Sequence, residues 1–183
     1  MTRTALIILY PGFEEMEAVA PIDLLARAGV DVTQASLGDA TLVPGRNGMT
    51  LKADCPLSEL SDKLLFDAII LPGGPGINNL RAHKEVCQRL QQHHTAGKLV
   101  AAICAAPLLL LDAGLIDHLG YTAHPTAANE LPNQLDEAFV FEGNILTSRG
   151  AGTATEFALT LVERLTNKET RLDVAGSICW RHD

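Results

Sequence analysis

One cysteine stands where a strand is expected to meet a helix. Residues 99–103 favour a buried strand, and Pro107 opens an apolar run that favours a helix. Between them, Cys104 is followed by Ala105 and Ala106, whose small side chains suit a sharp, strained turn. The free N–H groups of the helix would stabilise an anion, so we expect a lowered pKa for the Cys104 thiol and a nucleophilic role. The alternative is a packing role, because free cysteine is often buried.

Three acidic residues follow the first apolar run. Glu14 and Glu17 are three positions apart, with Glu15 between them, and share one face if the segment is helical. A carboxyl group buried beside a thiolate would have its pKa raised, which would make Glu17 a proton carrier near neutral pH. The alternative is an acidic first turn that complements the helix dipole.

A glycine pair follows the apolar run at residues 68–71. Gly73 and Gly74 would let backbone N–H groups approach a ligand oxygen and form an oxyanion site, although a plain turn could have the same sequence. No Gly-Lys-Ser/Thr follows the pair, which is therefore not a P-loop. The chain also has no GxGxxG motif, so no dinucleotide is expected.

The histidines do not form a metal-binding pattern. No pair has helical spacing with a carboxylate partner, so the sequence predicts no metal, and no other cofactor is expected. His124 follows Cys104 by about twenty residues and could reach the same cleft as an acid or base, or lie in a surface loop. His93 and His94 lie in the last turn of an expected helix, where we predict that they are solvated.

Short apolar runs without alternation indicate strands that are covered on both faces, as in a parallel sheet. These runs are residues 5–10, 68–71 and 99–103, and a break of small residues and a helical pattern follow each of them. Helices are expected at 14–28, 78–95 and 154–165, and extended segments at 30–36 and in hairpins about 44–48 and 139–147.

This alternation predicts a doubly wound α/β sandwich with a mostly parallel central sheet and helices on both faces. Right-handed crossovers put every strand-to-helix turn on one edge of the sheet, outside the carboxyl ends of the strands. The acidic turn at 11–17, the glycine turn at 72–75 and the cysteine turn at 104–107 are therefore expected to converge. Such convergence is a stronger indication of a site than any one motif.

Composition and charge restrict the number of domains and the kinds of partner that the sequence predicts. The 183 residues, 47% hydrophobic and 20% charged, predict one globular domain over 1–183. The net charge of −8 gives no electrostatic case for nucleic acid or an anionic membrane, and no apolar run is long enough to cross a bilayer. The chain does not begin with a signal-peptide pattern, and its four cysteines are widely spaced, so reduced thiols and a cytoplasmic location are expected.

These residues lie in motifs that resemble the ThiJ/PfpI superfamily over almost the whole chain. The matching segments are PGFEEMEAV at 11–19, PIDLLARAG at 21–29, DAIILPGG at 67–74, AAICAAP at 101–107, HP at 124–125 and TSRGAGT at 147–153. The resemblance implies a flavodoxin-like fold, a homodimer and chemistry without a cofactor.

The resemblance also implies roles for single residues. Cys104 would be the nucleophile, the carboxyl group of Glu17 would be hydrogen-bonded to its sulfur, and His124 would belong to the catalytic group. The positions that match the family's oxyanion and substrate-binding residues are Gly73, Gly74, Ala105, Glu14 and Arg46.

Three departures from the family pattern stand out. The segment 45–48 carries one extra residue, which affects the match of Arg46. Ala151 occupies a position usually held by proline, near the dimer-facing side of the pocket. Ala105 follows the cysteine where protease-type members carry histidine, so a Cys-His peptidase is not expected.

The function expected from these residues and the resemblance is a glyoxalase or protein deglycase. Its substrates would be methylglyoxal-type 2-oxoaldehydes or their early adducts on glycated protein side chains, attacked by Cys104 while Glu17 shuttles a proton. An alternative is an oxidative-stress sensor or chaperone that uses oxidation of the same cysteine to sulfinate. A third possibility is a binding module that retains the fold without turnover.

Overall fold

A computed structural model describes residues 2–181, and a seven-stranded sheet lies at its centre. The strands are β1 (Thr4–Leu9), β2 (Asp31–Ser36), β5 (Cys55–Pro56), β6 (Ala68–Leu71), β7 (Leu99–Ile103), β8 (Phe139–Glu142) and β9 (Ile145–Ser148). Their order is β5-β2-β1-β6-β7-β9-β8, and every pair is parallel except β8 with β9. A separate antiparallel hairpin is formed by β3 (Leu42–Pro44) and β4 (Thr50–Lys52).

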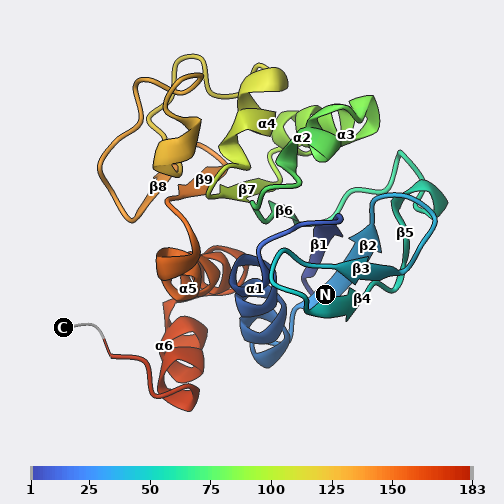
Figure 1. Ribbon diagram of the computed structural model, residues 1–183. Helices are drawn as coiled ribbons and strands as arrows, with labels where there is room; N and C mark the ends of the chain where they lie inside the picture. The colour runs from blue at the N-terminus through green and yellow to red at the C-terminus, as the bar shows by residue number, and fades with distance from the viewer. Residues whose placement is uncertain (1, 182–183) are drawn as a thin grey trace.

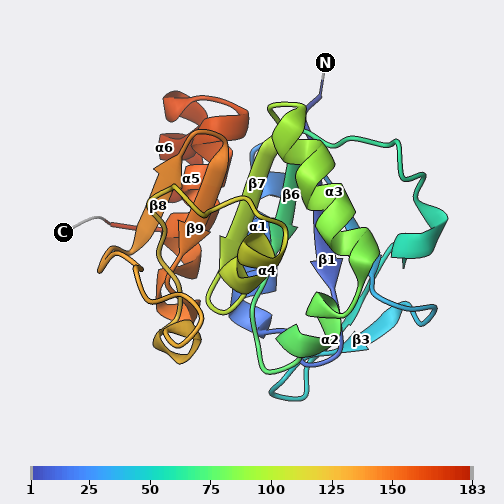
Figure 2. The ribbon, with the colours of Figure 1, turned by 90° about the horizontal axis from the view of Figure 1, so that it is seen from above.

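Helices cover both faces of this sheet (Figure 1). On one face lie α1 (Glu15–Arg27), α5 (Ala154–Leu165) and α6 (Lys168–Ser177), and on the other lie α2 (Ile77–Arg81), α3 (Lys84–Thr95) and α4 (Pro107–Asp112). Figure 2 views the sheet through the layer of α3 and α4. Short 3-10 turns occur at Leu57–Glu59, Pro125–Ala127 and Ala151–Thr153. The predicted flavodoxin-like α/β class is confirmed.

The central strands explain why the sequence lacks alternation. Every residue of β6 and β7 is buried, as are all residues of β1 except the first, because helices cover both sides of the sheet. Burying one such aliphatic side chain contributes about 1.5–3 kcal/mol. These strands therefore form a tightly packed sheet. Its carboxyl ends hold the following loops, and the functional groups on them, in place.

The positions of most predicted elements are confirmed. The helix expected at 154–165 is α5, that at 14–28 is α1, and both predicted hairpins are present. The sequence reasoning missed α6, whose only buried residues are Val174 and Ala175. It also missed the two-residue strand β5, which pairs at the edge of the sheet.

The single helix predicted at 78–95 is wrong, because the chain breaks into α2 and α3 at an extended residue, His83. The buried residues Leu80 and Val86 explain the break. They are six positions apart, or about 240° around a continuous helix, so one helix could not bury both on the same face.

His93 is fully buried in α3, and the prediction that it is solvated is wrong. Its Nε2 accepts the N–H of Phe66 at 3.2 Å, and its Nδ1 donates to the carbonyl of Arg89 at 2.7 Å. Because Nε2 accepts a hydrogen bond, the ring is neutral and carries its proton on Nδ1. Burial, and next the positive charges of Arg89 and Lys98, lower the pKa of His93.

We expect acid to weaken the fold through His93. Since its pKa in the folded state is lowered, its stabilising contribution is complete above an unfolded value of about 6.5 and is lost as the pH falls through the folded value. At neutral pH, His93→Leu should lower the free energy of unfolding by about 1–3 kcal/mol, because two buried backbone groups lose their partner. Urea unfolding of both proteins should show this difference shrinking below about pH 6.5; a constant difference would contradict the assignment.

Candidate active site

Three turns meet at the carboxyl edge of the sheet. They follow β1, β6 and β7, which are neighbours in the sheet order. The Glu14 N–H donates to the carbonyl of Gly73 at 2.8 Å, which ties the acidic turn to the glycine turn. A Cβ atom built on Gly73 would lie 2.7 Å from Cys104 Cβ and 2.9 Å from Glu17 Oε2, so the acid and the cysteine both pack closely against the backbone of Gly73.

Cys104 adopts a left-handed backbone conformation, with φ of +67°. A residue other than glycine in this region is strained by about 1–3 kcal/mol, and surrounding structure must hold it there. Two backbone bonds do so: the Cys104 N–H donates to the Ser148 carbonyl at 2.9 Å, and its carbonyl accepts the His124 N–H at 2.8 Å. The cysteine therefore lies at a fixed strand-to-helix elbow between β7 and α4.

Glu17 lies on the first turn of α1 and is buried against the elbow. Its Oε2 accepts the Gly73 N–H at 2.8 Å, while Oε1 is buried without a hydrogen-bond partner among residues 2–181. Burial raises the pKa of this carboxyl group to about 7, although the Gly73 N–H and the nearby Cys104 thiol oppose the shift. Glu17 is thus able to gain or lose a proton near neutral pH.

The expectation of a lowered pKa for the Cys104 thiol is wrong. Burial, first, and then the negative charge and hydrogen bond of Glu17 raise the thiol pKa to about 12, and only the Ala105 N–H opposes this. The helix dipole is a weak counterforce because α4 is six residues long. The thiol therefore needs a base beside it, and the carboxylate of Glu17 occupies that position.

The two groups titrate as a coupled pair. Near neutral pH the thiol keeps its proton, while Glu17, with a pKa of about 7, is present both as carboxylate and as carboxylic acid. The full ionisation of both would put two negative charges in contact in a buried site, which is unfavourable. The proton can instead move from sulfur to Glu17 as the sulfur forms a bond.

Glycine is required at both positions of the glycine turn. At Gly74, φ is +125°, and a side chain there would collide with the Gly12 carbonyl oxygen and with Glu14 N. The Gly73 N–H is used by Glu17, so the predicted oxyanion role of Gly73 is corrected to positioning that carboxyl group. Among the described residues, no backbone or side-chain oxygen accepts from the N–H of Gly74 or of Ala105, and both residues line the cavity beside Cys104.

His124 contributes to the same cavity from the segment after α4. Its Nδ1 accepts the Thr126 N–H at 3.2 Å and contacts Thr126 Oγ1 at 2.9 Å, which fixes the ring. Because a backbone N–H donates to Nδ1, the proton of the neutral ring is on Nε2. His124 also borders Gly150, where a Cβ would lie 3.3 Å from the ring.

Arg46 and Glu14 form an ion pair at the rim. Arg46 Nη1 lies 3.0 Å from Glu14 Oε2, and Arg46 lines the cavity of Cys104. Asn47 donates to Glu15 through its backbone N–H at 2.6 Å and its side chain at 3.0 Å. These bonds anchor the β3–β4 turn to α1, so the extra residue in segment 45–48 does not remove Arg46 from the site.

Sequence reasoning missed the buried hydroxyl of Tyr10. It donates to the Pro72 carbonyl at 2.9 Å and so fixes the start of the glycine turn. Burial, and then the charges of Glu17 and Cys104, raise the pKa of Tyr10. Its position at the end of the first apolar run was a usable signal, because that end belongs to the converging edge.

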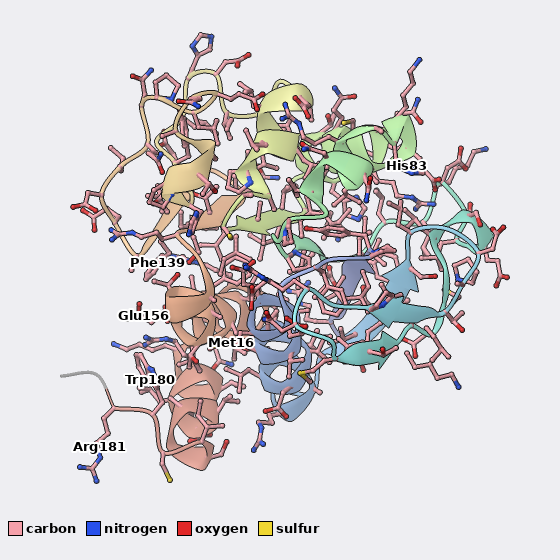
Figure 3. The ribbon with its side chains drawn as sticks, viewed as in Figure 1. Met16, His83, Phe139, Glu156, Trp180 and Arg181 are labelled. Atoms are coloured by element: carbon pink, nitrogen blue, oxygen red, sulfur yellow. The ribbon has the colours of Figure 1, made fainter. Side chains whose placement is uncertain are left out.

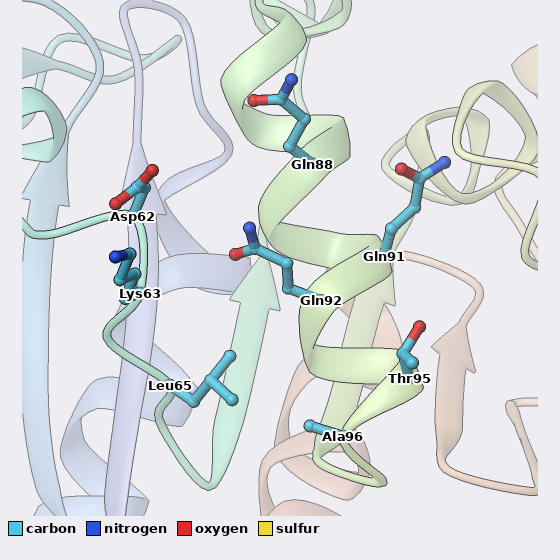
Figure 4. A pocket seen from close by; sticks show the side chains of 8 residues that line it. All are labelled: Asp62, Lys63, Leu65, Gln88, Gln91, Gln92, Thr95 and Ala96. Atoms are coloured by element: carbon cyan, nitrogen blue, oxygen red, sulfur yellow. The ribbon is translucent and has the colours of Figure 1, made fainter.

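The cavity beside Cys104 has a volume of about 600 Å³. A hollow of about 720 Å³ lies elsewhere, between the segment before β6 and the glutamines of α3 (Figure 4). That second hollow contains no cysteine or histidine and none of the predicted site residues. The chemistry therefore points to the smaller cavity.

Two absences within residues 2–181 complete the description. No group of three or more histidine, cysteine, aspartate or glutamate side chains could hold a metal ion in this range. Over the same residues, no helix combines the length and apolar character needed to span a membrane. The four cysteines, all described, are free thiols.

Fold and site together define a flavodoxin-like α/β protein with a cysteine at a strained strand-to-helix elbow and a buried acid beside it. The model of the DJ-1/PfpI family matches residues 3–164, and the chain belongs to this family. It is 40% identical over 184 residues to protein dj-1beta of Drosophila melanogaster, with 97% of each chain covered.

Two further comparisons agree. The chain is 34% identical to the glutathione-independent glyoxalase DJR-1.2 of Caenorhabditis elegans, over 97% of this chain and 96% of that protein. The crystal structure of Drosophila melanogaster DJ-1beta superposes with a TM-score of 0.94 at 37% identity and covers all of both chains. The resemblance expected from the motifs is confirmed.

Proposed function

We propose that this protein is a cofactor-independent glyoxalase that converts 2-oxoaldehydes such as methylglyoxal to 2-hydroxy acids. One observation carries the proposal: the thiol of Cys104, which lines a cavity of about 600 Å³, interacts with the buried carboxyl group of Glu17, whose pKa is about 7. The name of the Caenorhabditis elegans relative supports the same activity. Early adducts of these aldehydes on protein side chains would be a second group of substrates, making the protein a deglycase.

The first step is addition of sulfur to the aldehyde carbon. The Glu17 carboxylate accepts the thiol proton as the C–S bond forms, and the aldehyde oxygen becomes an alkoxide. The N–H groups of Gly74 and Ala105 are available to stabilise this oxygen. Return of the proton from Glu17 to the alkoxide gives a neutral hemithioacetal and restores the carboxylate.

The second step moves hydrogen within the substrate. Glu17 removes the proton from C1 and delivers it to C2, while the proton of the C1 hydroxyl passes to the C2 oxygen. The product is a 2-hydroxy thioester on Cys104. Water then cleaves the thioester, which releases the 2-hydroxy acid and regenerates the thiol. His124, with its proton on Nε2, is placed to assist transfers between the oxygens.

Proton NMR with methylglyoxal in a buffer that contains a metal chelator and no added thiol tests this proposal. We expect one lactate for each methylglyoxal consumed. Protein-dependent loss of methylglyoxal without lactate would contradict it, because arginine and cysteine side chains can trap the aldehyde without turnover.

A separate measurement distinguishes the deglycase reaction from the glyoxalase reaction. Adducts on N-acetylcysteine equilibrate with free aldehyde, so a glyoxalase consumes them no faster than they dissociate. A rate that stays at this dissociation limit as protein is added indicates action on the free aldehyde. A rate that exceeds the limit indicates direct action on the adduct.

A second candidate function is oxidation sensing at the same sulfur. It is favoured by the contact with Glu17, which in its protonated form could donate a hydrogen bond to a sulfinate oxygen. The raised pKa of the thiol opposes it, because the thiolate is the species that oxidises. Mass spectrometry after mild peroxide treatment tests it, and the candidate fails if Cys55 or Cys179 is oxidised before Cys104.

We also propose that two copies associate through the start of α1. Met16, labelled in Figure 3, is 58% exposed, and Met49 is 52% exposed. Both line an apolar hollow of about 290 Å³, and Val19 and Ala154 line it as well. Exposed apolar patches of this kind mark interaction surfaces, and most homo-oligomers are two-fold dimers.

Sedimentation velocity should therefore detect a dimer at micromolar concentrations. Met16→Glu is expected to raise its dissociation constant by about tenfold or more, because a charge would be desolvated in an apolar contact. The exposed residue Leu172 on α6 offers a control, Leu172→Glu. A monomeric wild-type protein, or equal effects of the two changes, would contradict the proposed interface.

A further inference from the structure

The cavity beside Cys104 extends well beyond the reacting centre. The part of its wall contributed by elements other than the Cys104 turn, called the far wall below, contains Asn78 from α2, Thr126 from the Pro125–Ala127 turn, and Glu130 just after that turn. Cavities of about 300–1,000 Å³ accommodate drug-sized ligands. A three-carbon aldehyde bound at Cys104 would leave much of the 600 Å³ volume for the far end of a longer substrate.

Glu130 is held at this far wall by Arg81. The guanidinium donates from Nη1 to Glu130 Oε1 at 2.9 Å and from Nη2 to Oε2 at 2.8 Å. The same guanidinium donates to both oxygens of Asp112, at 2.6 and 2.7 Å. Three segments that are distant in sequence, the ends of α2 and α4 and the chain after 127, are thereby joined, and the Glu130 carboxylate has a fixed orientation.

This arrangement leaves a surplus of negative charge at the cavity. One guanidinium, that of Arg81, is shared between two carboxylates, so the cluster carries one uncompensated negative charge. Arg46 also lines the cavity, but it is paired with Glu14, and this pair is neutral as a unit. The Cys104–Glu17 pair adds negative charge whenever Glu17 is ionised. The summed charge of these groups is therefore negative, and a negative potential in a cleft raises the local concentration of cationic ligands.

Glu130 is also accessible to a ligand. Its side chain is 51% exposed, and Arg81 occupies the side of the carboxylate that faces Asp112. Carboxylate oxygens have about four lone-pair sites, so Glu130 can accept further hydrogen bonds while it remains bound to Arg81. A cationic group that reaches the far wall would therefore find a preoriented acceptor.

We propose that Glu130, oriented by Arg81, makes the cavity selective by charge. It favours 2-oxoaldehydes whose far end is an ammonium or guanidinium group over those whose far end is a carboxylate or phosphate. This inference rests on the glyoxalase function proposed above and specifies the class of substrate. Glu130 is a specificity residue in this scheme and takes no part in bond making at Cys104.

Three phenylglyoxals with the same dicarbonyl group provide the test. They carry a para trimethylammonium group, no substituent, or a para carboxylate. The specificity constant kcat/KM is measured for each with the wild-type protein, Glu130→Gln and Asp23→Asn. Asp23 pairs with Arg27 on α1 and does not line the cavity, so Asp23→Asn controls for the loss of one exposed carboxylate.

In Glu130→Gln, the ratio of kcat/KM for the cationic to the anionic substrate should fall by about two- to fivefold, the range expected for a partly exposed charge pair. The comparison of variant with wild type cancels the intrinsic reactivity of each aldehyde and the amount of folded protein. Asp23→Asn should keep the wild-type ratio. Added salt should reduce the wild-type ratio because it screens the interaction.

The outcomes separate this inference from the function on which it rests. If the wild-type protein converts none of the three substrates and no methylglyoxal, the glyoxalase proposal and this inference both fall. Turnover with the same charge ratio in wild type and Glu130→Gln overturns the charge selectivity alone. An equal fall in Asp23→Asn also overturns it, because net charge rather than Glu130 would then be responsible.

Discussion

Cys104→Ser is expected to reduce lactate formation from methylglyoxal by about 10³-fold or more. A serine hydroxyl is a far weaker nucleophile than a thiol, and its oxygen has a much higher pKa, so Glu17 cannot draw off its proton as readily. The left-handed backbone at this position is retained by the bonds to Ser148 and His124, so the change removes sulfur and little else.

The matched control is Cys179→Ser. Cys179 is exposed, far from the cavity in sequence, and also adopts a positive φ, of 56°. Lactate measured enzymatically should form at the wild-type rate with this variant. Equal yields from wild type and Cys104→Ser would rule out a covalent mechanism at the elbow.

Glu17→Gln has the second-largest expected effect, a loss of about 10²–10⁴-fold in kcat/KM, the usual contribution of a general acid or base. The amide keeps the size of the side chain and an oxygen that can accept from Gly73, but it cannot take the thiol proton. The control Glu14→Gln changes a neighbouring acid that pairs with Arg46 and does not contact the sulfur. Its loss should be much smaller.

The pH dependence gives an independent check on Glu17. With a pKa of about 7, the carboxylate form that accepts the thiol proton disappears below neutral pH, so wild-type kcat/KM should rise through about pH 7. In Glu17→Gln this rise should be absent from the residual activity. A wild-type profile that is flat between about pH 6 and 8 would contradict the role of Glu17 as base.

The raised pKa of Glu17 affects stability and activity in opposite directions as the pH rises. Because the folded pKa of Glu17 is raised, its ionisation destabilises the fold, and the free energy of unfolding falls as the pH rises from about 4.5 towards the folded value of about 7. Glu17→Gln should therefore be more stable than wild type at alkaline pH while it is less active. Such an exchange of stability for activity is common where a charge is buried for chemistry.

The sequence was sufficient to predict the converging edge of the sheet. The apolar runs of β1, β6 and β7 are continuous because both faces of these strands are buried, and this pattern can be recognised in the sequence alone. Once the strands are parallel, the turns after them must share an edge. Cys104, Glu17 and Gly74 were therefore predictable as neighbours, and the structure brings them together.

Quantities that depend on distance and burial were not predictable in this way. The predicted direction of the Cys104 pKa shift was wrong because burial and then the negative charge of Glu17 raise the thiol pKa, and the short helix α4 has only a weak opposing dipole. The role of Gly73 depended on which N–H group reaches the carboxyl oxygen. The cluster at Arg81 joins residues up to 49 positions apart, and nothing in the local sequence of Glu130 indicates it.

The position of Gly73 limits how this site can change. No side chain fits there, since its first atom would touch the cysteine, the Ala105 nitrogen and the Glu17 carboxyl oxygen at once. Cys104 and Glu17 consequently pack against bare main chain, and a substitution at Gly73 would displace both of them. Variation among proteins with this arrangement must therefore act through the walls of the cavity, so that substrate preference can diverge while the reacting pair stays the same.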